Sequence, residues 1–351
     1  MVKHLVILTP GFSAAENDTE SIVFLQTLIK SINIQHPTIK ITIITFQFPF
    51  TTKTYTWFGN NVMPLNGRNS KAKKIWVWLK ALRVLKTLNS QTPISGILCC
   101  WLMDCSLIGK RFAKNNNIPF LCWAAGQDVK PNNRYLKLLR LQENELAVMS
   151  KNQAELLKLS NITCTKVIEN GILSEEFIPY RKTDANFSIH VLGVGSLTQL
   201  KNYIEFIHVI ELLSKQTPNI KCEILGDGPQ KELLQKNIAE KNLQNNITLI
   251  GAVSHNKVIE KMHQSLILLH PSTYEGNSTV MLEAAYAGNF VLCKPHVLRH
   301  QSGLMKSYAD INSAAEIITE ILKQHNTKPQ AEMLSSMHDR ANEILAHLKI
   351  N

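Results

Sequence analysis

Two carboxylates, Glu275 and Glu283, have seven residues between them, and their surroundings suit the binding of an anion. The local sequence indicates an apolar strand over Ser265–His270, a polar turn, and a helix that begins between Asn277 and Thr279. A strand that enters a helix through small residues points backbone N–H groups and the positive end of the helix dipole at one place. The acids therefore flank a predicted phosphate site. A nucleotide sugar, with a central diphosphate and hydroxyl-rich ends, would fit it.

Glycine-containing turns follow other predicted strands. Gly193–Asn202 (GVGSLTQLKN) is not a dinucleotide motif, because Thr198 stands where a third glycine belongs and no acidic residue follows at the expected spacing. Lys201 stands where a point charge reaches a bound phosphate, and a solvated lysine is the alternative. Ile224–Pro229 (ILGDGP) and Thr9–Asp18 (TPGFSAAEND) are weaker signals, since turn chemistry alone explains their glycines.

The composition bounds the class of protein. A chain of 351 residues with 44% hydrophobic and 19% charged residues predicts a soluble globular protein of two domains. The apolar run that ends at Pro10 is too short for a signal peptide, and no run approaches the length that spans a bilayer. Seven cysteines without a CxxC pair indicate a reducing compartment. We therefore expect a cytoplasmic protein. A peripheral position at the inner face of the membrane is an additional expectation.

The net charge of +11 is unevenly distributed. No acidic residue lies between Glu20 and Asp104, and such one-sided charge attracts a membrane surface, a phosphorylated acceptor or nucleic acid. The stretch Lys71–Lys86 (KAKKIWVWLKALRVLK) predicts a helix. Its basic face is either exposed to solvent or lies on a membrane surface, with the tryptophans at the level of the lipid headgroups. We expect no nucleic acid, because one helix interleaves too few aromatic and basic residues. The predicted apolar face comprises Ile75, Leu79, Leu82, Val84 and Leu85.

Strand-like and helical stretches alternate along the chain, which predicts an α/β fold of parallel sheets with helices on both faces. The expected strands are Leu5–Thr9, Ile41–Phe46, Ile94–Cys100, Pro119–Trp123, Glu145–Met149, Ile189–Val194, Lys221–Leu225, Ile247–Ile250, Leu266–His270 and Phe290–Cys293. The expected helices are Glu20–Ile32, Lys71–Leu88, Cys105–Asn115, Tyr203–Lys215, Gln230–Lys241, His255–Met262 and Thr279–Tyr286.

This alternation predicts two doubly wound Rossmann-like domains that face a cleft, with the carboxyl ends of both sheets directed at it. The first domain covers residues 1–170. Residues 171–187 form a linker, and residues 188–328 form the domain that binds the nucleotide sugar. The tail 329–351 is expected to be one helix, over Pro329–Ile350, that packs back on the body.

The histidines show no metal-ligand spacing, and neither a Cys/His cluster nor a G-x-S-x-G elbow occurs. We therefore expect no cofactor and no metal.

The motifs resemble the retaining GT-B glycosyltransferases, the large "glycosyl transferase group 1" family (family four). EGNSTVMLEAAYAG is similar to its E-x7-E segment. In the same order as in the family, GVGSLTQLKN resembles G-R-L-x-x-x-K, ILGDGP resembles I-G-x-G-P, NITLIG resembles V-x-F-L-G, and LHPSTYEG resembles x-P-S-x-x-E-G. VIENGILSEEFIP and, in the first domain, IPFLCWAAGQDV also match family patterns.

The resemblance implies roles for individual residues. Lys201 would contact the donor diphosphate, Glu275 would lie at the transferred sugar, and these two would be the catalytic residues. Glu283 would bind the ribose hydroxyls, and Gly11 would form the first-domain turn at the donor. The other implied donor-binding residues are Gly195, Ser196, Gly226, Gly228, Gly276, Asn277, Ser278 and Thr279. Gly126 and Asp128 are the implied acceptor-side residues.

Two positions depart from the family pattern. Ser196 stands where many members have arginine, so Lys201 and the helix N-terminus would carry more of the leaving-group charge. Ala125 stands where many have a histidine that touches the donor sugar.

The resemblance implies a metal-independent glycosyltransferase that moves a sugar from a nucleoside-diphosphate sugar to a glycan or lipid-linked acceptor, with retention. Its setting would be the biosynthesis of surface polysaccharide or glycoconjugates. Two alternatives remain: a sugar-nucleotide epimerase or hydrolase of the same fold, and a non-catalytic nucleotide-binding protein that docks on anionic membranes.

Overall fold

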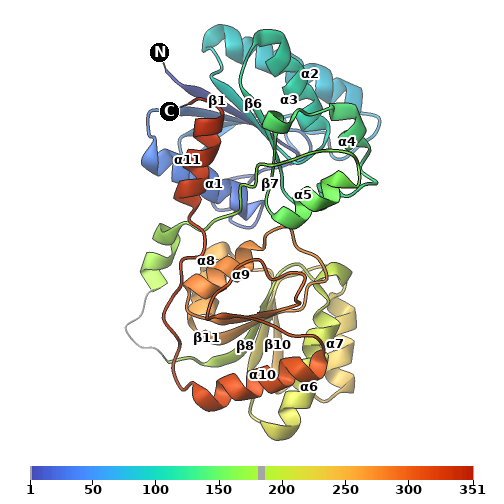
Figure 1. The fold of residues 1–351 in the computed structure, drawn as a ribbon, viewed down its shortest axis with the longest axis vertical. Helices are drawn as coiled ribbons and strands as arrows, with labels where there is room; N and C mark the ends of the chain where they lie inside the picture. Colours follow the sequence, from blue (N-terminus) through green and yellow to red (C-terminus); the bar gives the residue numbers. More distant parts are fainter. Residues whose placement is uncertain (1, 181–185, 351) are drawn as a thin grey trace. The chain divides into compact units, whose positions relative to one another are not determined.

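The chain forms two compact units in a computed structural model, which describes residues 2–180 and 186–350 (Figure 1). Unit 1 comprises the chain up to Gly171 together with the segment from Met337 onward, and unit 2 is Ile172–Ser336. Each unit has its own sheet and its own buried apolar core. The segment expected to be a linker contains a 3-10 helix, η3 (Ser174–Tyr180), that lies in unit 2, and residues 181–185 fall outside the described part.

The sheet of unit 1 has the strand order β3-β4-β2-β1-β5-β6-β7. All neighbouring strands are parallel except the antiparallel pair β3 and β4. The central strand β1 is buried along its whole length, as expected for a parallel strand covered on both faces. The strands are β1 (His4–Thr9), β2 (Lys40–Thr45), β3 (Tyr55–Trp57), β4 (Asn60–Pro64), β5 (Gly96–Cys100), β6 (Phe120–Ala124) and β7 (Leu146–Val148).

The helices of unit 1 cover this sheet. They are α1 (Val23–Gln35), α2 (Lys74–Gln91), α3 (Asp104–Asn116), η1 (Gln127–Val129), α4 (Arg134–Leu139), η2 (Glu143–Glu145), α5 (Lys151–Lys158) and α11 (Met337–His347). The C-terminal helix α11 packs beside α1, and the Ser31 hydroxyl and His338 Nδ1 are 2.8 Å apart between them (Figure 1).

The expectation of one helix over Pro329–Ile350 is wrong in its first part, because the helix begins at Met337. The preceding segment is held in extended contacts with unit 2: the Glu332 amide donates to the Ala285 carbonyl, and Ser336 forms a bridge with Ile172. These contacts use backbone groups that a helix would need for itself.

The sheet of unit 2 is parallel throughout, with the order β10-β9-β8-β11-β12-β13. The chain winds from β8 outward to β10 on one side and then starts again at β11 on the other side of β8. The gap between β8 and β11 is therefore the switch point of this sheet, where ligands bind in open α/β folds. The strands are β8 (Ile189–Val194), β9 (Cys222–Leu225), β10 (Ile247–Gly251), β11 (Ser265–His270), β12 (Phe290–Cys293) and β13 (Met305–Ser307).

The helices of unit 2 are η4 (Gln199–Lys201), α6 (Tyr203–Gln216), α7 (Lys231–Glu240), α8 (His255–His263), α9 (Thr279–Tyr286) and α10 (Ile311–Gln324). Every strand expected from the sequence is present, with ends shifted by two residues or fewer. The strands β3, β4 and β13 were not predicted.

The apolar face predicted for α2 is wrong in part. The buried residues of this helix are Val77, Ala81 and Leu85. Ile75 and Leu79, which were expected to be covered, are 69% and 50% exposed.

Candidate functional site

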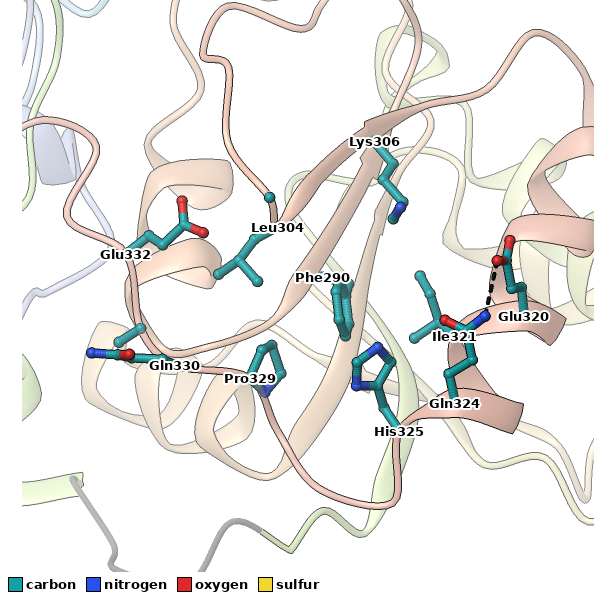
Figure 2. A pocket seen from close by; sticks show the side chains of 12 residues that line it. Phe290, Leu304, Lys306, Glu320, Ile321, Gln324, His325, Pro329, Gln330 and Glu332 are labelled. Atoms are coloured by element: carbon teal, nitrogen blue, oxygen red, sulfur yellow. Dashed lines mark hydrogen bonds between the residues drawn. The ribbon is translucent and has the colours of Figure 1, made fainter.

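A cavity of about 610 Å³ in unit 2 does not coincide with the predicted site (Figure 2). Its lining includes Phe290, the first residue of β12, and Leu304, which directly precedes β13. The cavity therefore opens at the amino edge of the sheet, whereas the predicted site residues follow the carboxyl ends of the strands. Its lining combines Lys306, Glu320 and Glu332 with His325, so no single charge dominates it.

Lys201 and Glu275 lie on the two turns that flank the switch point. Lys201 ends η4, in the turn after β8, and Glu275 lies in the turn after β11. The turns are joined through the Leu200 carbonyl, which accepts hydrogen bonds from the Thr273 amide at 2.9 Å and the Thr273 hydroxyl at 3.1 Å. The fold thus brings together two charged residues that are 74 positions apart.

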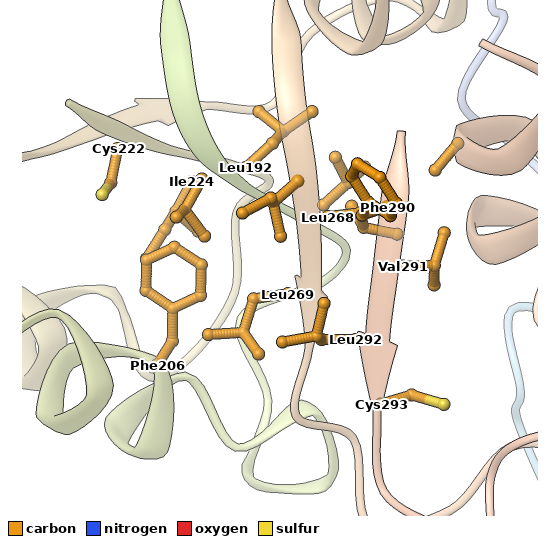
Figure 3. Packing of buried hydrophobic residues seen from close by; sticks show 14 of the residues in the cluster. Leu192, Phe206, Cys222, Ile224, Leu268, Leu269, Phe290, Val291, Leu292 and Cys293 are labelled. Carbon is orange, nitrogen blue, oxygen red and sulfur yellow. The ribbon is translucent and has the colours of Figure 1, made fainter. Parts of the chain in front are cut away.

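The Glu275 carboxylate is the centre of a three-residue network. Its Oε1 accepts hydrogen bonds from Lys201 Nζ and, at 2.8 Å, from Nε2 of His270. His270 is the last residue of β11 and is 1% exposed. The two preceding residues, Leu268 and Leu269, pack in the core of unit 2 (Figure 3). A buried imidazole needs a polar partner, and the carboxylate supplies one.

The electrostatics of this network fix its protonation states. Burial alone would raise the pKa of Glu275, but the hydrogen bond from His270 and the charge of Lys201 lower it to about 2. Burial lowers the pKa of His270, and the neighbouring carboxylate opposes that effect only in part. At neutral pH the site therefore holds an ionised Glu275 and a neutral His270 that donates through Nε2–H.

The start of α9 opens at the same turn. The predicted anion-binding residues Gly276 and Asn277 precede this helix, Ser278 is its N-cap and Thr279 its first residue. Ser278 has extended backbone angles, and its side chain makes no capping hydrogen bond. The first turn of a helix carries the positive end of the dipole, which suits a phosphate group.

Glu283 lies inside α9 and is 4% exposed. Its Oε1 is 2.7 Å from Nε2 of His255, the first residue of α8. The other ring nitrogen, Nδ1, is 3.7 Å from the carboxylate of Glu176 in η3. The structure therefore gives Glu283 a protein partner, and its predicted contact with ribose hydroxyls stays a prediction.

The glycines predicted at the donor site allow two turns to touch. Gly195 and Gly226 have φ angles of 148° and 140°, and a Cβ on Gly226 would lie 2.0 Å from the Gly195 carbonyl oxygen. A Cβ on Gly228 would lie 2.6 Å from the Leu197 carbonyl oxygen. The close approach in the structure is thus between neighbouring turns of the protein, while Ser196 beside them is exposed.

The predicted residues of unit 1 have structural contacts of their own. The side chain of Asp128 is partly buried, and this loss of solvent raises the pKa of its carboxyl group. It accepts hydrogen bonds from the amides of Leu102 at 2.7 Å and Gly126 at 2.9 Å. Gly11 follows β1, and its carbonyl accepts from the Thr9 hydroxyl at 2.9 Å. Asp128 therefore ties together the turns after β5 and β6, two adjacent parallel strands.

Sequence reasoning missed His270 and His255. A buried strand that ends in histidine was a usable signal for His270, because such a side chain requires a partner. No comparable signal existed for His255, whose contact depends on how α8 packs against α9.

Among the described residues, no group of three or more His, Cys, Asp or Glu side chains is arranged to hold a metal ion. The seven cysteines are buried free thiols. In the described part of the chain, no helix has both the length and the apolar character needed to span a bilayer.

The family model for "Glycosyl transferases group 1" matches residues 181–340. The chain is 29% identical over 163 residues to the gpi3 subunit of phosphatidylinositol N-acetylglucosaminyltransferase from Schizosaccharomyces pombe. That match covers 46% of this chain and 36% of the relative, so the chain matches only about a third of the relative's length.

Solved structures match over nearly the whole chain. Sucrose-phosphate synthase from Thermosynechococcus elongatus has a TM-score of 0.72 and 15% identity, with 99% of this chain and 94% of that chain covered. HepE from Anabaena in complex with UDP and glucose has a TM-score of 0.66 and 14% identity, with 99% and 97% covered.

The expected resemblance to the group 1 glycosyltransferase family is confirmed for residues 181–340, which include most of unit 2. The expected α/β fold of two Rossmann-like domains, the GT-B class, is likewise confirmed.

Proposed function

We propose that the protein is a glycosyltransferase that moves a sugar from a nucleoside-diphosphate sugar to a glycan or lipid-linked acceptor. The observation that carries this proposal is the network of Lys201, Glu275 and His270 at the switch point of unit 2. The match to the family model supports the reaction class. In this proposal unit 2 binds the donor and unit 1 binds the acceptor, in the assembly of surface polysaccharide or glycoconjugates.

The chemistry in this proposal is stabilisation of the leaving diphosphate. As the bond between the sugar and the diphosphate breaks, negative charge grows on the phosphate oxygens, and preorganised donors aimed at them lower the barrier. Lys201 turns from Glu275 to the diphosphate, and the first turn of α9 adds its dipole. Glu275, kept ionised by His270, then faces the sugar. No metal or cofactor takes part, and the sugar is transferred with retention.

Relatives suggest the chemical classes of donor and acceptor. The name of the gpi3 relative specifies transfer of N-acetylglucosamine to phosphatidylinositol, and the HepE structure holds UDP and glucose. We propose a hexose or N-acetylhexosamine attached to UDP or GDP as the donor. A phosphorylated or lipid-linked acceptor would match the basic charge of the N-terminal half.

Incubation with a panel of nucleotide sugars and extracted lipid-linked acceptors tests the reaction. We expect thermal stabilisation by one nucleoside diphosphate and transfer of labelled sugar from the matching donor. NMR of the product gives the anomeric configuration and checks retention. The Lys201→Ala variant should lose turnover by roughly a hundredfold or more, by analogy with removal of one oxyanion donor. Near-normal turnover would mean that another residue holds the diphosphate.

Donor alone separates the enzymatic alternatives. A transferase releases little nucleotide without acceptor, whereas a hydrolase releases it freely and an epimerase changes the sugar while it stays attached.

A membrane contact is the proposed second activity, and the start of α2 supports it. Ile75, Trp76 and Leu79 are each at least half exposed, and Lys80 Nζ lies 5.1 Å from the centroid of the Trp76 ring. Basic residues flank this apolar patch in the sequence and are exposed as well: Lys71, Lys73, Arg83 and Lys86. Exposed apolar side chains among cations suit the interface of an anionic bilayer. The protein would then be peripheral at the cytoplasmic face of a membrane.

Flotation with vesicles of phosphatidylglycerol and phosphatidylcholine tests this contact. The double variant Trp76→Ser, Leu79→Ser should lose binding to anionic vesicles while it keeps nucleotide binding. Leu159→Ser is the matched control, because Leu159 is 71% exposed elsewhere on unit 1. Equal flotation of the double variant and the wild type excludes the α2 surface. If the double variant loses both flotation and nucleotide binding, it is misfolded, and this outcome contradicts the interpretation.

A further inference from the structure

The loop after β12, residues 294–304, is fixed to the turns of the candidate donor site. At its start, Lys294 Nζ lies 2.6 Å from Oε1 of Glu205 in α6 and 4.5 Å from the centroid of the Tyr308 ring. Two residues later, Nε2 of His296 is 2.9 Å from the Thr273 carbonyl oxygen. These contacts attach the loop to the helix after β8 and to the turn after β11.

Arg299 of this loop lies beside Glu275. Its Nη2 donates to the main-chain carbonyl of Glu275 at 3.4 Å, and its side chain is close enough to the Glu275 carboxylate and the Tyr274 ring for both to act on its pKa. Burial nevertheless lowers the pKa of this guanidinium. An arginine remains charged even so, because its ordinary pKa is far above neutral. Arg299 is therefore a half-buried cation at the site that already contains Lys201.

The strand order explains how a residue so late in the chain reaches this place. β8, β11 and β12 are consecutive in the parallel sheet, so their carboxyl ends lie in a row. Lys201 follows the first of these strands, Glu275 the second and Arg299 the third. Position 196, in the turn after β8, is a serine and adds no charge to this row.

We infer that Arg299 is a second diphosphate contact, supplied by the loop after β12. This inference rests on the proposed function, since it requires a nucleoside diphosphate in unit 2. The charge balance supports it: in the structure the Lys201 ammonium is matched by the Glu275 carboxylate, and a diphosphate brings more negative charge than one lysine neutralises. The planar fork of arginine also suits two phosphate oxygens at once.

Titration calorimetry with UDP, GDP, UMP and GMP tests the inference. We expect Arg299→Gln to weaken the binding of the preferred diphosphate about ten- to hundredfold, the range for a hydrogen bond to a charged group. Binding of the corresponding monophosphate should change much less. Arg299→Lys should fall between the two, because it keeps the charge and loses the fork. Lys306→Gln, an exposed cation in β13 of the same unit, is the control and should bind as the wild type does.

Three outcomes would overturn the inference, and they are distinguishable. Wild-type diphosphate affinity in Arg299→Gln removes Arg299 from the site and leaves the proposed function intact. If Arg299→Gln lowers the affinity for diphosphate and monophosphate equally and also lowers the unfolding temperature, Arg299 only stabilises the turn. Absence of binding of all four nucleotides by the wild type overturns the proposed function together with this inference.

Discussion

Replacement of Lys201 by methionine should destabilise unit 2 in a way that depends on pH. The pKa of Glu275 is lowered from 4.5 to about 2. At about 1.4 kcal/mol per pH unit, this difference amounts to roughly 3 kcal/mol in favour of the ionised form. Because burial opposes the change, His270 and Lys201 together contribute at least that much. The side chains of Lys201 and Glu275 are 18% and 14% exposed, so solvent screens the pair only weakly. Loss of the lysine should lower the free energy of unfolding by about 2 kcal/mol at pH 7.

The sign of the pH dependence follows from the lowered pKa. A carboxyl group with a lower pKa in the folded protein stabilises it above the ordinary pKa of 4.5, and this stabilisation is lost as the pH falls toward 2. The difference between wild type and Lys201→Met should therefore be full at pH 7 and should shrink between pH 4.5 and pH 3.

Urea unfolding at pH 7, 4 and 3 measures this effect. All five tryptophans lie in unit 1, so their fluorescence follows that unit, while circular dichroism at 222 nm follows both units. We expect the fluorescence transition to stay in place and the remaining transition to move. Lys236→Met is the matched control: Lys236 pairs with Glu240, but both side chains are more than half exposed, and the change should stay within about 0.5 kcal/mol. A difference that is constant from pH 7 to pH 3 would refute the reasoning.

Three further changes test other parts of unit 2. Glu283→Gln should weaken UDP or GDP binding about tenfold or more while the fold is kept, because the amide oxygen still accepts from His255; unchanged affinity by calorimetry removes Glu283 from the site. Lys328→Met should raise the free energy of unfolding, because burial lowers the pKa of this lysine to about 7 and its buried charge destabilises the folded protein. The gain should be greatest below pH 7 and should shrink as the pH rises toward 10.5. A gain in urea titrations that does not depend on pH would contradict this reasoning. Gly226→Ala should cost more than about 2 kcal/mol, because its methyl group would overlap the carbonyl of Gly195, and a wild-type melting temperature would exclude that overlap.

The sequence alone named two of the charged residues that the structure joins at the candidate site. Lys201 and Glu275 were assigned from their turns, and the strand–turn–helix pattern around Glu275 predicted the start of α9 at Thr279. The contact between these two residues was not predictable, because it depends on β8 and β11 being neighbours in the sheet. His270 joins this network because it ends β11. Arg299 reaches it because β12 is the next strand in the sheet.

Short or atypical elements also escaped the sequence. β3 and β13 are edge strands of three residues each, too short for a periodic signal, and β4 includes polar Asn60 and Asn61. In α2 the apolar run from Ile75 to Leu79 is unbroken, so no single stripe identifies the covered face.

By itself the sequence determined the alternation of strands and helices and the two-domain plan, because apolar periodicity and turn residues act locally. Its ordered motifs carried the resemblance to the family. Only the tertiary structure decided that α11 belongs to unit 1, that α2 exposes Trp76, and that Lys201, His270 and Arg299 converge on Glu275. These are contacts between segments far apart in the chain. They follow from strand order and helix packing, which the local pattern of a sequence does not encode.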